Sequence, residues 1–136
     1  MNITTTSFNT DKMVTKILIV DDSPIARKML KSCLPKDDNL EFFEAGDGKD
    51  GLEKYKDIRP DITFMDLTMP VMTGYEAIDE IIKFDEKAMI IVVTADIQMK
   101  AIKKVMDSGA FMVLKKPLNK ENINSALLKA LESRNN

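Results

Sequence analysis

The chain has 136 residues, of which 44% are hydrophobic and 31% are charged, and this size and composition favour one compact domain. Its 20 Lys and Arg residues against 22 Asp and Glu residues give a net charge of -2, so no overall positive field favours nucleic-acid binding. Histidine is absent and Cys33 is the single cysteine, which excludes a His-based catalytic triad, a His-ligated zinc site and an internal disulfide.

The first residues show no apolar periodicity. Residues 1–15 are rich in Thr, Asn and Ser, and we expect them to form a flexible N-terminal tail without an export signal. We expect residues 16–134 to form the folded domain, with no output domain after it. The longest apolar stretches have only the length of a strand, too short to cross a bilayer, so we expect a cytoplasmic protein without membrane insertion.

Five short apolar runs rich in Ile, Val, Phe and Met predict five β-strands. They cover residues 16–20, 40–44, 61–65, 89–93 and 111–114. Helical patterns separate the strands: one apolar stripe consists of Ile25, Met29 and Cys33 with Ala26, Leu30 and Leu34, and another of Ile123, Leu127, Leu128 and Leu131. Strict alternation of apolar strands with helices favours an α/β fold, in which five helices cover both faces of a doubly wound, five-stranded parallel sheet.

Polar side chains follow four of the five expected strands. In open parallel sheets the working site lies beyond the carboxyl ends of the strands. Asp21 and Asp22 come after the first strand, Asp66 after the third, Thr94 after the fourth and Lys116 after the fifth. In the flavodoxin-like strand order 2-1-3-4-5 the first and third strands are neighbours, so the three carboxylates are expected to share one crevice.

Three carboxylates in one crevice repel one another, so the cluster requires a cation. Oxygen ligands favour Mg²⁺, with Mn²⁺ as the alternative. An Asp carboxylate beside such an ion can attack a phosphoryl donor and form an aspartyl phosphate, provided that the metal and a second cation neutralise the phosphoryl oxygens. Lys116 supplies that cation and Thr94 a hydroxyl donor. Each residue alone is more often an ordinary surface or capping residue, but the four positions together rarely coincide by chance.

Four stretches, ILIVDDS, MDLTMPVMTG, IIVVTA and LKKPL, resemble the receiver domains of two-component response regulators, in the CheY-like superfamily. The likeness spans residues 17–118, and the helical pattern extends it to residue 134. It implies that Asp66 is the phosphoacceptor, that Mg²⁺ is held by Asp21, Asp22, Asp66 and the backbone carbonyl of Thr68, and that the phosphoryl group contacts Thr94 and Lys116. It also implies a cis peptide bond between Lys116 and Pro117.

One position departs from the family's pattern. Val113 stands three residues before Lys116, where many members carry a Tyr or Phe that moves with the strand-end Thr. Alternation along the strand places Val113 toward the fourth helix, and Phe111, of the same parity, is an alternative moving group. Thr68 and Asp96, two residues beyond Asp66 and Thr94, occupy positions that in this family modulate the lifetime of the phosphoryl group.

The resemblance also implies partners. A sensor histidine kinase or a His-phosphotransfer protein would supply the phosphoryl group, and an output protein would bind through the fourth helix, fifth strand and fifth helix. No direct contact with nucleic acid and no turnover of a separate substrate are expected. A phosphorelay intermediate and a phosphate sink stay open as alternative roles.

Two other classes compete with this interpretation. A phosphohydrolase of the haloacid dehalogenase type also uses Asp, Thr, Lys and Mg²⁺, but its nucleophile follows the first strand in a DxDxT pattern, where this chain reads VDDSP. It also needs a cap insertion, which is missing. An interaction module that kept only the fold would not need all five site residues. Turnover of a small phosphomonoester and Mg²⁺-dependent phosphorylation of Asp66 distinguish the three classes.

Overall fold

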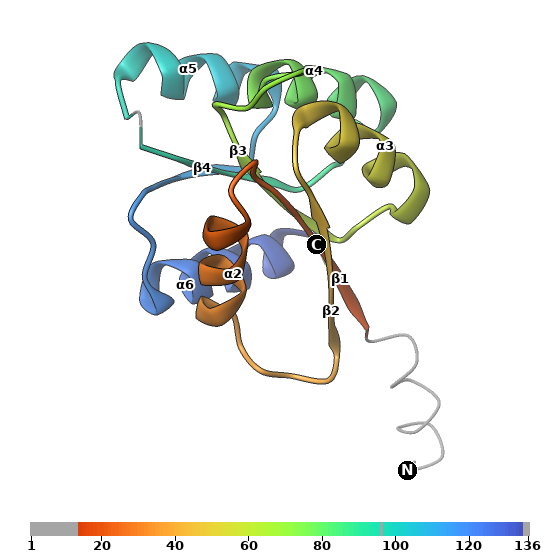
Figure 1. Ribbon diagram of the computed structural model, residues 1–136, viewed down its shortest axis with the longest axis vertical. Helices are drawn as coiled ribbons and strands as arrows, with labels where there is room; N and C mark the ends of the chain where they lie inside the picture. The colour runs from red at the N-terminus through yellow and green to blue at the C-terminus, as the bar shows by residue number, and fades with distance from the viewer. Residues whose placement is uncertain (1–13, 96, 135–136) are drawn as a thin grey trace.

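The computed structural model describes residues 14–95 and 97–134, so residues 1–13 of the tail expected over residues 1–15 and the modulating position Asp96 lie outside the described residues. Within them, five strands alternate with five helices (Figure 1). The strands are β1 (Thr15–Val20), β2 (Leu40–Ala45), β3 (Ile62–Asp66), β4 (Ile90–Thr94) and β5 (Met112–Lys115). The helices are α2 (Pro24–Cys33), α3 (Gly48–Ile58), α4 (Gly74–Phe84), α5 (Met99–Ser108) and α6 (Lys120–Arg134).

All neighbouring strands pair in parallel, and their order across the sheet is β2-β1-β3-β4-β5, as predicted. β1 therefore lies between β2 and β3, at the point where the strand order reverses. Each predicted strand boundary agrees with the structure to within one residue. The small difference matters at two positions, because Asp66 and Thr94 are the last residues of β3 and β4 rather than the first residues after them.

Helices cover both faces of the sheet (Figure 1). Leu18 and Met65 belong to the core on the side of α3, α4 and α5, whereas Ile19 and Phe64 belong to the core on the side of α2 and α6. Successive residues of a strand point to opposite faces, so both cores draw on the same strands. Every residue of β3 and β4 is buried, and apart from Thr63 and the strand-end residues Asp66 and Thr94 both strands are apolar.

Side-chain hydroxyl groups cap the N-termini of α2 and α4, the two helices that follow the loops after β1 and β3. The Ser23 hydroxyl accepts a hydrogen bond from the amide of Ala26, and Pro24 opens α2. At the start of α4, Thr73 and Glu76 form a reciprocal capping box. These caps end the loops after β1 and β3 at defined points.

Among the helices of residues 14–95 and 97–134, none has the length and apolar character needed to span a bilayer.

The apolar stripe predicted on α2 is divided differently in the structure. Leu30 and Leu34 are buried against the sheet, but Ile25 is 71% and Met29 56% exposed. Consecutive helix positions lie about 100° apart around the axis. When the row with Leu30 and Leu34 faces the sheet, the row with Ile25 and Met29 therefore faces solvent. On α6, Leu128 is likewise exposed. The apolar stripes predicted on α2 and α6 are therefore only partly buried.

Val113 and Phe111 lie on opposite sides of the sheet. Val113 packs against the core beneath α3, α4 and α5, as strand alternation predicts, whereas Phe111 packs against the core beneath α2 and α6. Because β5 begins at Met112, Phe111 precedes the strand and does not follow its alternation. Phe111 therefore does not replace the aromatic side chain that the family often carries at the position of Val113.

Candidate functional site

Three carboxylates gather at the carboxyl ends of β1 and β3. Asp21 and Asp22 follow β1, and Asp66 ends β3. One carboxylate oxygen of each lies within 4.8 Å of the others. They meet because β1 and β3 are paired neighbours, with Val20 beside Met65. Asp21 is 7% and Asp66 9% exposed, whereas Asp22 is exposed, so the cluster opens to solvent on one side.

Lys116 extends into this cluster from the segment after β5. Its Nζ donates a hydrogen bond to Oδ2 of Asp21 at 3.0 Å and lies 3.4 Å from Oδ1 of Asp66. The Lys116–Pro117 peptide bond is cis. One ammonium group faces three carboxylates, so the crevice keeps an excess of negative charge. A second cation would relieve this repulsion.

The surroundings change the pKa of two of these groups. Burial raises the pKa of Asp66, the charge of Asp21 raises it further, and Lys116 partly opposes both effects. Burial acts to lower the pKa of Lys116, but the hydrogen bond to Asp21 and the charges of both carboxylates outweigh it and raise the pKa. Lys116 therefore stays protonated, while Asp66 is a carboxylate whose negative charge is stabilised by an added cation.

The other predicted site residues lie at the same edge of the sheet or in its loops. Thr94 is the buried last residue of β4, and its carbonyl accepts a hydrogen bond from the amide of Lys116 at 2.8 Å. Thr68 is exposed in the loop between β3 and α4. Val113 pairs with Val92 of β4. The structure thus brings Asp21, Asp66, Thr94 and Lys116 to one edge.

The loop after Asp66 is closely packed. The amide of Gly74 donates to the carbonyl of Leu67 at 2.9 Å, which closes the loop at the start of α4. Within it, Val71 adopts a left-handed backbone with φ of 69° and is 78% exposed. A β-branched residue rarely adopts this conformation, so the loop is held under strain beside the site.

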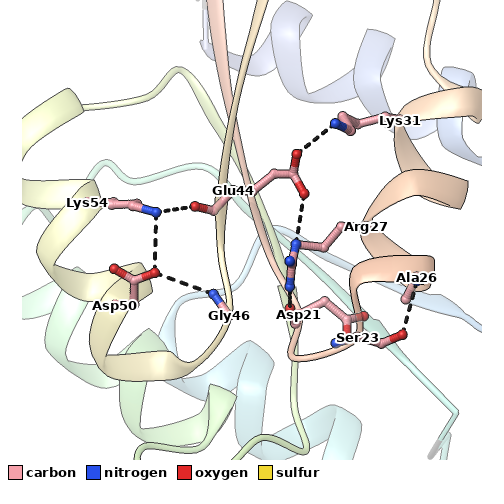
Figure 2. A network of polar contacts seen from close by, with 9 residues as sticks. All are labelled: Asp21, Ser23, Ala26, Arg27, Lys31, Glu44, Gly46, Asp50 and Lys54. Carbon is pink, nitrogen blue, oxygen red and sulfur yellow. Dashed lines mark hydrogen bonds and ion pairs between the residues drawn. The ribbon is translucent and has the colours of Figure 1, made fainter.

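Three residues of the site's surroundings, Arg27, Lys31 and Glu44, were missed by the sequence analysis. Figure 2 shows Arg27 of α2 between the Asp21 carbonyl and the Glu44 carboxylate of β2. Lys31 donates to the second oxygen of Glu44 at 2.6 Å, and the hydrogen bonds from Lys31 and Arg27 lower the pKa of Glu44. The one signal in the sequence was Glu44 itself, a charge in a half-buried strand, which needs a partner.

A cavity of about 450 Å³ adjoins the cluster. Asp66 and Lys116 line it together with Met29, Leu30 and Cys33 of α2, and its wall is mostly apolar. The Asp66 carboxylate is therefore reached from a mostly apolar cavity.

The donor atoms of the cluster suit a hard divalent cation. In the described residues the grouping consists of carboxylates alone, without nitrogen or sulfur ligands, and such oxygen sets are typical of Mg²⁺ and Mn²⁺. The excess negative charge and the raised pKa of Asp66 both favour a bound cation. The residues present therefore fit a magnesium site.

A family model described as the response regulator receiver domain matches residues 17–128, and the chain belongs to this family. It is 40% identical to the chemotaxis protein CheY of Thermotoga maritima over 114 matched residues, which make up 84% of this chain and 95% of that protein. It is 37% identical to the chemotaxis protein CheY of Bacillus subtilis over 119 matched residues, which make up 88% of this chain and 99% of that protein.

Solved structures agree. A CheX-CheY-BeF3-Mg²⁺ complex from Borrelia burgdorferi contains a chain with a TM-score of 0.81 and 28% identity, covering 86% of this chain and 89% of that chain. A CheY-like receiver domain from Methanospirillum hungatei has a TM-score of 0.83 at 23% identity, covers 90% of this chain and 97% of that chain, and supports the fold. The chain is a CheY-type receiver domain, which implies two-component signalling and not turnover of a separate substrate.

Proposed function

We propose that this protein is a cytoplasmic phosphoacceptor response regulator. A sensor histidine kinase or a His-phosphotransfer protein phosphorylates Asp66 in the presence of Mg²⁺, with Mn²⁺ as a substitute, and phosphorylation changes binding to an output protein. The observation that carries this proposal is the contact of Lys116 with the buried carboxylates of Asp21 and Asp66, in a cluster with excess negative charge. Such a cluster can neutralise an incoming phosphoryl group only together with a cation.

In this proposal the metal is held by Asp21, Asp22, Asp66 and the carbonyl of Thr68. When bound, it supplies positive charge to the phosphoryl oxygens. An oxygen of Asp66 attacks the phosphorus atom, the bond from phosphorus to the donor's imidazole nitrogen breaks, and an aspartyl phosphate forms. Lys116 and Thr94 contact the phosphoryl oxygens and orient the group. Thr68 and Asp96 modulate how long it survives.

The phosphoryl donor approaches over α2. The exposed apolar side chains of Ile25 and Met29 offer a contact face, and Met29 also lines the cavity that reaches Asp66. A donor helix packed on this face brings an imidazole ring into the mostly apolar cavity. This geometry supports α2 as the donor side of the protein.

The output partner binds a different face, formed by α5, β5 and α6, which are the fourth helix, fifth strand and fifth helix of the chain. Ile97, Met99 and Met106 are exposed there, beside Lys100 and other lysines of α5. Two of these lysines also make contacts within the chain: Lys103 pairs with Asp107 at 2.6 Å, and Lys104 lies 4.5 Å from the ring centre of Tyr75. An apolar patch edged by lysines suits an acidic protein partner, and the weak net charge gives no support for nucleic acid.

Intact-mass measurement tests the assignment of Asp66. The protein is incubated with a phosphorylated His-phosphotransfer protein or acetyl phosphate, with Mg²⁺ or with a chelator. We expect one added phosphoryl group with Mg²⁺ and none with the chelator. Asp66→Asn should abolish the addition, whereas Asp57→Asn, an exposed Asp on α3, should not. Equal labelling of wild type and Asp66→Asn would overturn the proposal.

A further inference from the structure

Arg27 connects the acidic cluster to β2 through the backbone of Asp21. Its Nη1 donates to the carbonyl oxygen of Asp21 at 2.6 Å, and its Nε donates to Oε1 of Glu44 at 2.8 Å (Figure 2). The guanidinium group is planar and holds its donors in a rigid arrangement, so two bonded partners determine its orientation. The Arg27 side chain is mostly buried, which strengthens both bonds relative to a solvent-exposed pair.

The remaining polar groups of Asp21 are also bonded. Its amide donates to the carbonyl of Ala45 at 3.1 Å, its Oδ1 accepts from the amide of Ser23 at 2.9 Å, and its Oδ2 accepts from Lys116. The bond from Arg27 acts on the peptide group between Asp21 and Asp22. Rotation of that peptide group would move both carboxylates, because it joins the two residues directly.

Arg27 can act on Mg²⁺ affinity in two opposite ways: orienting the metal ligands would raise the affinity, and its positive charge would lower it. A cation near a metal site lowers the affinity for Mg²⁺ by Coulomb repulsion, so removing the charge of Arg27 or of Lys31 would by itself leave that affinity unchanged or raise it. Glu44, whose lowered pKa keeps it ionised, bonds to both and offsets part of this charge. Lys31 also bonds to Glu44, at 2.6 Å, whereas the hydrogen bond to the carbonyl of Asp21 comes from Arg27.

We propose that Arg27 is a positioning residue for the metal ligands: by bridging the Asp21 carbonyl and the Glu44 carboxylate, it sets the orientation of the Asp21 and Asp22 carboxylates toward Mg²⁺. This inference rests on the proposed function, in which these carboxylates hold the metal. Partners that orient a metal ligand without touching the metal commonly change metal affinity by about 10- to 100-fold.

The test compares Arg27→Met with Lys31→Met. Both substitutions remove one positive charge and one bond to Glu44 while keeping an apolar stem. Isothermal titration with MgCl₂ measures the Mg²⁺ affinity, and urea unfolding in chelator measures the stability of each variant. We expect Arg27→Met to weaken Mg²⁺ binding at least about tenfold. Lys31→Met should bind Mg²⁺ as tightly as wild type or slightly more tightly, because Coulomb repulsion decreases.

The sign of the change decides the outcome. Unchanged Mg²⁺ binding by Arg27→Met overturns the inference, because Arg27 would then have no net effect on the metal ligands. Tighter binding also overturns it, because Arg27 would then act only through its charge. Equal weakening in both variants also overturns it, because the effect would come from loss of the Glu44 network as a whole. Arg27→Lys keeps the charge and reaches a single partner. We expect an intermediate Mg²⁺ affinity for it, and the same comparison applies if Arg27→Met does not fold.

A metal-free measurement provides a second readout. In ¹⁵N NMR spectra recorded with chelator, Arg27→Met should shift the Asp22 and Ser23 amide signals and speed hydrogen exchange at Ser23, whereas Lys31→Met should not. Unchanged signals in Arg27→Met overturn the inference. If the wild-type protein itself binds no Mg²⁺, the proposed function fails. If wild type and Arg27→Met bind Mg²⁺ equally, the proposed function stands and only the role of Arg27 fails.

Discussion

A Cβ atom on Gly74 would lie 2.0 Å from the carbonyl oxygen of Asp66, and 2.7 Å from the Cα of Leu67. These neighbours are backbone atoms, which cannot rotate away as a flexible side chain can. The start of α4 therefore packs against the residue proposed to accept the phosphoryl group, and the absence of a side chain at Gly74 is a condition for the position of Asp66.

Gly74→Ala should consequently move the Asp66 backbone and destabilise the protein by about 1–3 kcal/mol, the usual cost of overpacking. Urea unfolding measures the loss, and intact-mass measurement should show slower phosphorylation. Gly46→Ala is the matched control, because its nearest new contact is Nη1 of Arg27 at 3.8 Å, an ordinary distance. We expect the control to change stability by less than about 1 kcal/mol. Equal effects of the two substitutions would contradict the prediction.

Asp66→Asn should stabilise the Mg²⁺-free protein by about 1 kcal/mol at neutral pH, as changes that relieve an unfavourable functional group often do. Burial and the charge of Asp21 raise the pKa of Asp66 above its ordinary value of 3.8. Between that value and the raised pKa, the folded protein binds a proton that the unfolded chain has lost. The free energy of unfolding of wild type therefore falls as pH rises through this interval.

The advantage of Asp66→Asn should accordingly shrink as the pH is lowered through the raised pKa toward 3.8. Urea unfolding in chelator at a series of pH values measures it. Adding Mg²⁺ should stabilise wild type more than Asp66→Asn, because the ion binds the folded state through the carboxylate. An advantage that grows at low pH, or equal stabilisation of both proteins by Mg²⁺, would count against the pKa assignment and the metal site respectively.

Val71→Asn should stabilise the protein by about 1 kcal/mol, because Asn tolerates the left-handed backbone that Val71 adopts at φ of 69°. The side chain is exposed, so its replacement loses little apolar burial. Val71→Thr is the control: it keeps the β-branch and the strain, and we expect its stability to match wild type within about 0.5 kcal/mol. Thermal unfolding followed by circular dichroism measures both, and no gain from Asn would mean that the loop is unstrained.

Activation should reach α5 without rotation of an aromatic ring on β5. Val113 has one stiff torsion and packs against the core beneath α5, so it cannot move between buried and exposed positions as Tyr or Phe can. Motion of Thr94 toward the phosphoryl oxygens would instead shift the segment that leads from β4 into α5.

Backbone and methyl NMR spectra, recorded with Mg²⁺ and beryllofluoride, test this route. We expect changes across residues 97–106 and an unchanged ring of Phe111, which packs on the other side of the sheet. Asp66→Asn under the same conditions should show none of these changes. Signals that change only in the site loops would show that α5 is not the output surface, and a new rotamer of Phe111 would contradict a switch without a moving ring.

The strand ends, and with them the main residues of the candidate site, were predictable from the sequence. Asp21, Asp66, Thr94 and Lys116 each lie at or just after a predicted apolar run, and the carboxyl ends of parallel strands share one edge of the sheet. Locating the strands to within one residue was therefore enough to bring these four residues together. The alternation of strands and helices predicted a parallel sheet, whereas the strand order came from the flavodoxin-like fold that the resemblance implies.

Only the tertiary structure decided the orientation of α2 on the sheet. Its apolar stripe is wide, so more than one rotation buries a row of side chains, and the packing of Leu30 and Leu34 left Ile25 and Met29 exposed. The same rotation brings Arg27 between Asp21 and Glu44. Partners on three separate elements have no common spacing in the chain, because the distance between them depends on how whole elements pack and not on local periodicity.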